Sequence, residues 1–188
     1  MLETRRQGLI KALGDADAQV REAAATALEA LESAQELSTI LETLANGDRG
    51  AKVKAIFALE RVHSPEVFPP LLAQLKNSDE DLRAAAMQIL GIKAHPKTLS
   101  TIVKHLKDPH PAVRVRTAEA LGHFHDPRLV PYLATCLKND DDALASASAE
   151  ALGRIGAAEA EVSLLERLDD PRPSVRLAVV TALGKIGS

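Results

Sequence analysis

The chain has 188 residues and a formal net charge of -3, from 23 basic and 26 acidic side chains. It lacks the basic excess that draws proteins to nucleic acid or to anionic lipid, so we expect neither nucleic acid nor a membrane as a partner. Because there is no tryptophan, one tyrosine and three phenylalanines, the core must be aliphatic, which favours closely packed helices. The single cysteine, Cys136, excludes an internal disulfide, and the lack of a long apolar stretch predicts a cytoplasmic protein.

One dipeptide recurs at a constant interval along the chain. Ala27-Leu28 returns 31 residues later as Ala58-Leu59, and the same interval then gives Ile89-Leu90, Ala120-Leu121, Ala151-Leu152 and Ala182-Leu183. A column of leucines has the same period and consists of Leu13, Leu44, Leu75, Leu106, Leu137 and Leu168. This self-similarity predicts one domain built of six repeats, at residues 2–32, 33–63, 64–94, 95–125, 126–156 and 157–187.

The first half of each repeat has the periodicity of an amphipathic helix. Apolar pairs precede the leucine column by three and four residues, as Leu9 and Ile10 precede Leu13. Because proline is tolerated in a first helical turn, the starts of the later first helices are marked by Ser64-Pro65, His95-Pro96 and Asp126-Pro127. Further prolines at Pro69, Pro70 and Pro131 predict that a short initial turn precedes the main helix.

The second half of each repeat predicts another helix, beginning near residues 18, 49, 80, 111, 142 and 173. The position before these helices is held by Asp17, Asp48, Asp79, His110, Asp141 and Arg172. Aspartate is a preferred residue at this position, and proline follows His110 and Arg172, where a first-turn proline costs no hydrogen bond. Two helices in each of six repeats predict an all-α fold of about twelve helices and no strand.

Two polar columns fall at the turn between the paired helices. One consists of Asp15, Asn46, Asn77, Asp108, Asn139 and Asp170, and the other of Arg21, Lys52, Arg83, Arg114 and Arg176. We interpret them as structural, because a guanidinium group at this turn can satisfy backbone carbonyls and the neighbouring Asp or Asn. The alternative interpretation is a charged ladder for an acidic partner.

The runs LKDPHPAVRVRTAEALGHFHDPRLVPYL, residues 106–133, and LDDPRPSVRLAVVTALGKIG, residues 168–187, resemble the short HEAT-like repeats first grouped with phycobilisome lyases. The resemblance extends over the whole chain and implies a right-handed α-solenoid whose second helices line the concave side. It specifies architecture much better than function. Ala145, where other repeats have a basic residue, and Lys93, in an apolar column, predict local irregularity in the fifth and third repeats.

The residue types that support catalysis or metal binding have simpler structural interpretations. His63 and His125 share a column with Gly156 and Gly187, which predicts left-handed helix terminators, and His95 and His110 lie at helix starts. A metal site near His95, His123 and His125 is the alternative. Cys136 has no activating histidine that the repeat register would force into reach, and the column Gly91, Gly122, Gly153 and Gly184 predicts close helix approach. We therefore expect no catalytic residue, no cofactor and no metal.

The exposed positions of the second helices vary between repeats, whereas the core columns do not. Variation of this kind leaves a face free for recognition of a partner protein, although a solvated helix face is the simpler alternative. The predicted contact patch on the concave face consists of Phe57, Arg61, Gln88, Arg116, Glu119, His123, Glu150, Arg154 and Lys185.

The predicted function is a non-catalytic scaffold that binds a partner protein of unknown identity along the concave face. The family resemblance keeps a second hypothesis open, a bilin lyase-like or other cofactor-handling protein. The third class, a nucleic-acid binder or an enzyme, has less support, since HEAT-repeat hydroxylases carry repeated His-Glu pairs and this chain has none. The last repeat also carries the apolar residues Val162, Val179, Val180 and Ile186. They predict either self-association through this repeat or continuation of the array.

Overall fold

The computed structural model describes residues 1–186, and these residues form α-helices and short 3-10 helices without any strand. The predicted all-α solenoid class is thereby confirmed. The chain divides into two compact units, Met1–Val62 and His63–Ser188. None of the helices among the described residues is both long enough and apolar enough to cross a membrane.

The first unit consists of α1 (Leu2–Ala12), α2 (Ala18–Asn46) and α3 (Arg49–Ala58), with α2 packed against both of the others. The prediction of two separate helices between residues 18 and 46 was wrong, because α2 is one continuous helix of 29 residues. The repeat boundary expected between residues 32 and 33 lies inside it. Residues 29–39 contain only helix-compatible residues and no proline or glycine, whereas each later boundary has one of them. The described residues therefore form eleven α-helices and not twelve.

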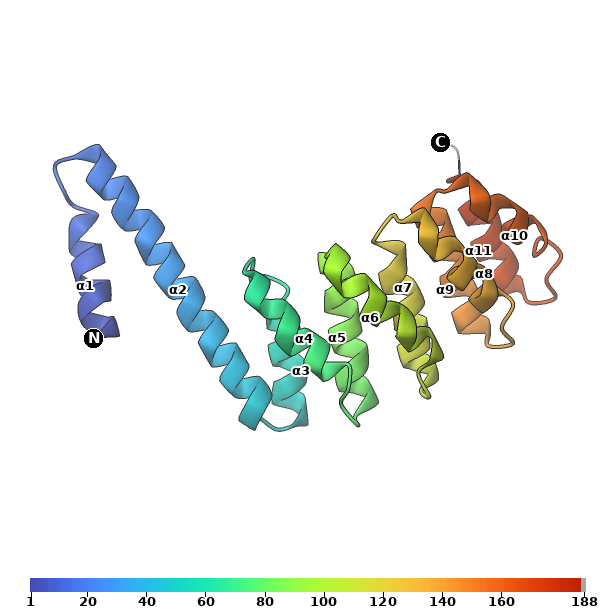
Figure 1. The fold of residues 1–188 in the computed structure, drawn as a ribbon, viewed down its shortest axis with the longest axis horizontal. Coiled ribbons are helices and arrows are strands. Elements are labelled where there is room, and N and C mark those ends of the chain that lie inside the picture. The colour runs from blue at the N-terminus through green and yellow to red at the C-terminus, as the bar shows by residue number, and fades with distance from the viewer. Residues whose placement is uncertain (187–188) are drawn as a thin grey trace. The chain divides into compact units, whose positions relative to one another are not determined.

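The second unit alternates first and second helices in the predicted order. Its elements are η1 (Pro65–Val67), α4 (Phe68–Gln74), α5 (Glu80–Lys93), η2 (Pro96–Thr98), α6 (Leu99–Ile102), η3 (Val103–Lys107), α7 (Pro111–Gly122), η4 (Pro127–Leu129), α8 (Val130–Leu137), α9 (Asp142–Ile155), η5 (Ala158–Ala160), α10 (Glu161–Leu165) and α11 (Pro173–Leu183). The short turn predicted before the main helix is confirmed by η1 and η4, and η2 forms the same turn in the fourth repeat. The second helices α5, α7, α9 and α11 pack on one another in succession, and each first helix packs on the second helix of its own repeat (Figure 1).

All six predicted starts of the second helices are confirmed, at residues 18, 49, 80, 111, 142 and 173. Four of these helices are preceded by an aspartate, namely Asp17, Asp48, Asp79 and Asp141. The carboxylate of each aspartate accepts hydrogen bonds from backbone N–H groups of the first helical turn. His110 and Arg172 provide no such bond, and the proline that follows each of them removes one N–H group that would need a partner.

The glycine column explains how closely the second helices of the second unit approach one another. A Cβ atom placed on Gly91 would lie 2.6 Å from the Cβ of Ala120. A Cβ atom on Gly122 would lie 3.0 Å from the Cα of Ala151, and one on Gly153 would lie 2.7 Å from the Cα of Ala182. Close approach is thus confirmed for three of the four glycines. An added Cβ on Gly184, in the last repeat, would have no described atom nearer than 3.6 Å, so close approach at this glycine stays a prediction.

The first unit lacks this packing device. In the glycine column, its two repeats carry Glu29 and Glu60. A glutamate side chain does not permit the backbone-to-backbone approach that glycine allows. The tight second-helix stack is therefore a property of the unit that begins at His63.

The structural interpretation of the polar turn columns is confirmed. The Arg83 Nη1 donates to the carbonyl oxygens of Asn77 and Ser78, at 2.9 and 3.0 Å. Three other arginines repeat this pattern with the two turn carbonyls of their own repeats: Arg21, Arg114 and Arg176. Five of the six Asp and Asn residues of this column accept a hydrogen bond from the backbone N–H two residues later, as Asn77 does from Asp79, and the exception is Asn46 at the end of α2. These side chains are engaged in holding the turns.

One member of these columns also links two repeats. The Arg83 guanidinium donates to both carboxylate oxygens of Asp108, from Nε at 3.0 Å and from Nη2 at 2.9 Å. Both residues are buried. Burial by itself would raise the pKa of the Asp108 carboxyl, but hydrogen bonds from Arg83, from the His110 backbone and from His105 outweigh it and hold that pKa below its ordinary value. The carboxylate is therefore ionised in the folded protein at neutral pH.

The pH dependence of stability at low pH should reflect Asp170. Hydrogen bonds from the Arg172 guanidinium, at 2.8 and 3.0 Å, lower the pKa of this carboxyl to about 2. An unfolded aspartate titrates near about 3.9, so its contribution is complete above that pH and is lost as the pH falls toward 2. We expect Asp170→Asn to flatten the fall of the urea midpoint between pH 4 and pH 2. Asp169→Asn removes an exposed neighbouring carboxylate, and a similar flattening in this control would contradict the assignment.

Two predictions about repeat ends and regularity need correction. His125 has a left-handed backbone with φ of 50°, as predicted, but His63 does not. The reason is that α3 already ends at Ala58, so His63 is too far from the helix end to terminate it. Ala94, which holds the same repeat position in the third repeat, is also left-handed, with φ of 42°. Gly187 lies outside the described residues. The predicted irregularity in the third and fifth repeats was wrong, since α5 and α9 are unbroken helices of 14 residues.

Candidate functional site

The structure brings five of the nine predicted contact residues together on the second helices of the second unit. These five residues are Gln88, Arg116, Glu119, His123 and Arg154, and they line a pocket of about 340 Å³. Ile92 and Ala120 also line this pocket. Gln88 and Ile92 come from α5, Arg116 and Glu119 from α7, and Arg154 from α9. We call this pocket the second-helix pocket.

Ion pairs hold the charged side chains of the second-helix pocket in place. Arg116 Nη1 lies 2.8 Å from Glu119 Oε2, and Arg154 Nη2 lies 3.6 Å from Glu150 Oε2. The Nη1 of Arg154 also donates to the backbone carbonyl oxygen of Glu119, at 3.4 Å, which connects α9 to α7. Charges of both signs therefore line the pocket, and each of them has a partner in the pocket or beside it.

His123 adds a neutral polar group to this pocket. Partial burial, together with the positive charges of Arg154 and His125, lowers the pKa of the His123 ring below its ordinary value, against the opposing effect of Glu119. The ring is thus uncharged at neutral pH and can both donate and accept a hydrogen bond.

The remaining predicted residues lie outside the second-helix pocket. Glu150 is exposed on α9 beside it, and Lys185 is exposed beyond the end of α11. Phe57 and Arg61 belong to the first unit, where Phe57 is 39% exposed on α3 and Arg61 is exposed after it.

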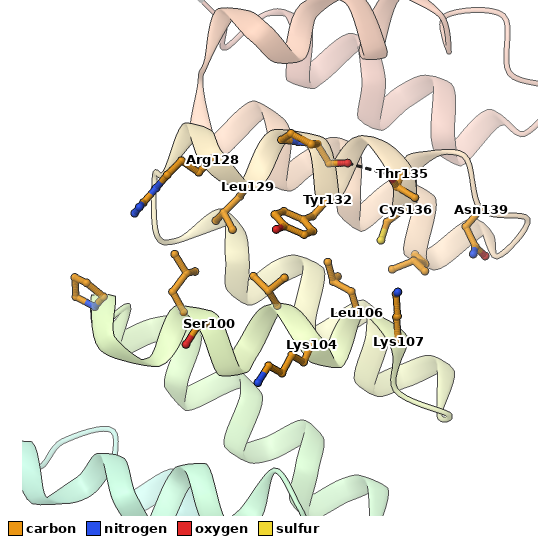
Figure 2. Close-up of a pocket in the computed structure, with 15 residues that line it drawn as sticks. Ser100, Lys104, Leu106, Lys107, Arg128, Leu129, Tyr132, Thr135, Cys136 and Asn139 are labelled. Carbon is orange, nitrogen blue, oxygen red and sulfur yellow. Dashed lines mark hydrogen bonds between the residues drawn. The ribbon is translucent and has the colours of Figure 1, made fainter.

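A larger groove lies on the opposite layer, between the first helices of the fourth and fifth repeats, and the sequence reasoning missed it. Its volume is about 1270 Å³. Fifteen residues from η2, α6, η3, η4, α8 and α9 line it: Pro96, Leu99, Ser100, Val103, Lys104, Leu106, Lys107, Arg128, Leu129, Pro131, Tyr132, Thr135, Cys136, Asn139 and Leu144. We call it the first-helix groove. Figure 2 shows Leu129 and Tyr132 pointing from one wall toward the helix that carries Lys104 and Lys107.

The groove combines an apolar floor with a basic rim. Leu106, Leu129 and Leu144 are buried in its floor, whereas Tyr132 remains 52% exposed. Lys104 and Lys107 are exposed at the rim, and none of the lining residues is acidic. One signal in the sequence could have identified this groove: Tyr132 stands in a repeat column otherwise made of Gly8, Thr39, Pro70, Thr101 and Ser163. A lone aromatic residue among small ones is not required by the repeat itself.

The only cysteine among the described residues, Cys136, is half-buried in the first-helix groove. Burial raises the pKa of the Cys136 thiol, with a smaller opposing effect of Arg114. An elevated thiol pKa disfavours the nucleophilic thiolate at neutral pH. Among residues 1–186, no three histidine, cysteine, aspartate or glutamate side chains lie where they could hold one metal ion.

Several apolar side chains of the last repeat are exposed. Val162 and Val180 are 67% and 57% exposed, as the sequence led us to expect, and Leu177 is exposed as well. Val179 is fully buried, and the expectation was wrong there because this side faces into the repeat. Association through this surface remains a prediction.

Comparison with protein families identifies one family. The family model described as HEAT repeats matches residues 6–88, 37–106, 68–152 and 140–188, so that its matches together extend from residue 6 to the end of the chain. A comparison with curated proteins finds no match.

Several solved structures have a similar fold. The complex of CpcE and CpcF of phycocyanin lyase from Nostoc sp. PCC7120 matches with a TM-score of 0.67 and 20% identity, covering 79% of this chain and 98% of that chain. YibA of E. coli matches with a TM-score of 0.64 and 19% identity, over 97% and 72% of the two chains. An engineered protein matches with a TM-score of 0.59 and 18% identity, over 96% and 95%. At these identities, the similarity concerns the fold alone.

Proposed function

We propose, because the chain belongs to the HEAT repeat family, that it is an interaction module which binds a partner protein along its second helices and catalyses no reaction itself. The observation that carries this proposal is the second-helix pocket, where exposed and partly exposed side chains from three successive repeats converge. Repeat arrays bind in this manner because each repeat adds a few variable side chains to one continuous surface.

The chemistry of the second-helix pocket supports recognition over acid–base catalysis. Its carboxylate Glu119 is engaged in an ion pair with Arg116, at 2.8 Å, and no second carboxylate among the described residues lines the pocket to serve as its partner in acid–base chemistry. Ile92 is 45% exposed beside these charges. An exposed aliphatic side chain surrounded by paired charges and by a neutral histidine is typical of a protein interface with an apolar centre and a polar rim.

Affinity capture from the lysate of the source organism tests this function. The bait is the full chain, compared with a variant that carries Ile92→Glu and Arg116→Glu, two exposed positions whose replacement leaves the core packing intact. We expect a partner protein that binds the wild-type chain and whose affinity for the purified variant falls by at least about tenfold. Arg154 is left unchanged, because it also connects α7 to α9.

The control variant is Lys76→Glu, which changes the charge of an exposed residue outside the second-helix pocket. It should retain the partner. Far-UV circular dichroism and thermal melting of all three proteins exclude a folding defect. Partners that bind the double variant as tightly as the wild type would refute the assignment of this face.

A further inference from the structure

We infer that the first-helix groove is a second binding site, which takes an acidic segment of a partner protein with its apolar side chains in the groove. This inference goes beyond the proposed function, because the groove lies on the other layer of helices and shares no residue with the second-helix pocket. The two sites can therefore fail or succeed independently.

The charge of the groove determines the sign of the charge that its occupant must carry. Three of its lining residues are basic and none is acidic, in a chain whose net charge is -3. Lys104 and Lys107 form no ion pair with any described residue, whereas Arg128 is already paired with Asp126 at 2.6 Å. Two unneutralised ammonium groups beside an apolar floor are complementary to carboxylates that flank apolar side chains.

The apolar part of the groove determines the kind of side chain that enters it. Leu99 and Val103 are half-buried on one wall and Tyr132 is half-exposed on the other. Tyrosine is enriched at the centres of protein interfaces because its ring buries a large area at a small cost in conformational entropy. The volume of about 1270 Å³ exceeds the roughly 300–1,000 Å³ of typical small-molecule sites, so it suits several residues of a peptide.

One wall of the groove departs from regular α-helix. The first helix of the fourth repeat is only α6, of four residues, followed by the 3-10 helix η3 of five residues, whereas the corresponding helices of the fifth and sixth repeats, α8 and α10, have eight and five. A 3-10 stretch that continues a helix often marks a functional or a strained segment. Val103, Lys104 and Lys107 all lie on η3.

Selection from a random peptide display library against the immobilised full-length chain provides a direct test. We expect enrichment of peptides that combine aspartate or glutamate with large apolar residues. The same library is selected in parallel against a Lys104→Glu/Lys107→Glu variant, where this enrichment should disappear. A failure to enrich any peptide, or enrichment of neutral or basic peptides, would overturn the inference.

Synthetic copies of the enriched peptides then measure the contribution of individual residues. Tyr132→Ala should weaken binding by about 30-fold, the effect of losing a central aromatic anchor. Lys107→Glu should weaken it by about tenfold, and this effect should shrink as salt is added. Lys76→Glu is the matched control, since Lys76 and Lys107 hold the same repeat position and only Lys107 lines the groove. Equal losses in Lys76→Glu and Lys107→Glu would show general electrostatic attraction to the chain and would overturn the site.

The reactivity of the native Cys136 thiol shows where the peptide binds, and this measurement needs no substitution in the protein. It is the only cysteine of the chain and lines the groove, so alkylation of the protein by N-ethylmaleimide follows this one position. A saturating enriched peptide should slow alkylation at least about fivefold, by covering the thiol. Unchanged alkylation with bound peptide would place the peptide elsewhere and refute the inference. Because Ile92→Glu/Arg116→Glu should leave this protection intact, loss of the proposed function and loss of the groove are distinguishable.

Discussion

Asp108→Ala is expected to lower the free energy of unfolding by about 3–5 kcal/mol, because it leaves a buried guanidinium group without its counter-charge. The side chains of Arg83 and Asp108 are only 11% and 4% exposed, and two hydrogen bonds join them. Asp108 also accepts a hydrogen bond from the backbone N–H of His110, at 2.9 Å, so the turn before α7 loses a partner as well. Urea unfolding followed by far-UV circular dichroism measures the change.

Three further variants separate the charge from the turn. Asp108→Asn retains an acceptor for the His110 N–H, as Asn77 and Asn139 do in their own turns, and should fall between the wild type and Asp108→Ala. Arg83→Met combined with Asp108→Ala should recover part of the loss, since the unpaired buried charge is gone. Glu166→Ala breaks the exposed pair with Lys138 and should cost at most about 1 kcal/mol. An Asp108→Ala loss no larger than that of Glu166→Ala would contradict the buried-pair argument.

Gly91→Ala should destabilise the second unit by about 1–3 kcal/mol, although alanine is the better helix former by about 1 kcal/mol. The added Cβ would lie 2.6 Å from the Cβ and 2.7 Å from the Cα of Ala120, so α5 and α7 must move apart. Backbone atoms cannot rotate out of the way as a long side chain can. The measurement is again the urea midpoint, at constant denaturant slope.

Gly184→Ala is the matched control for this prediction. Gly184 holds the same repeat position in the last repeat, has right-handed helical backbone geometry, and has nothing within 3.6 Å of an added Cβ. There we expect no loss, or a small gain in stability of up to about 1 kcal/mol. A Gly91→Ala variant that is as stable as Gly184→Ala would show that the second helices do not depend on this close approach.

Much of the candidate site was predictable from its repeat position alone. Gln88, Arg116 and Arg154 belong to exposed columns of the second helices, and a regular stack brings such columns to one face. The hydrogen bond from the Arg154 guanidinium on α9 to the backbone carbonyl of Glu119 on α7 was not predictable. It depends on a side-chain rotamer and on the spacing of α7 and α9, which the periodicity does not determine.

The first-helix groove could not have been predicted from periodicity, because it arises where the array is irregular. An α-helix was expected through Val103 and Leu106, but this segment is the 3-10 helix η3. This segment packs on α7, and the apolar periodicity alone does not distinguish a 3-10 helix from an α-helix here. The unusual residue at Tyr132 was visible in the sequence, yet only the fold shows that it shares a groove with lysines of the preceding repeat.

The sequence by itself determined the helical class, the 31-residue period, the six starts of the second helices and the glycine column. These features follow from local chemistry: capping carboxylates, first-turn prolines and the apolar periodicity of each helix. The tertiary structure alone decided the division after Val62, the Arg83–Asp108 link and the first-helix groove. Each of these depends on packing between segments distant in sequence, and their energies are set by burial and not by repeat position.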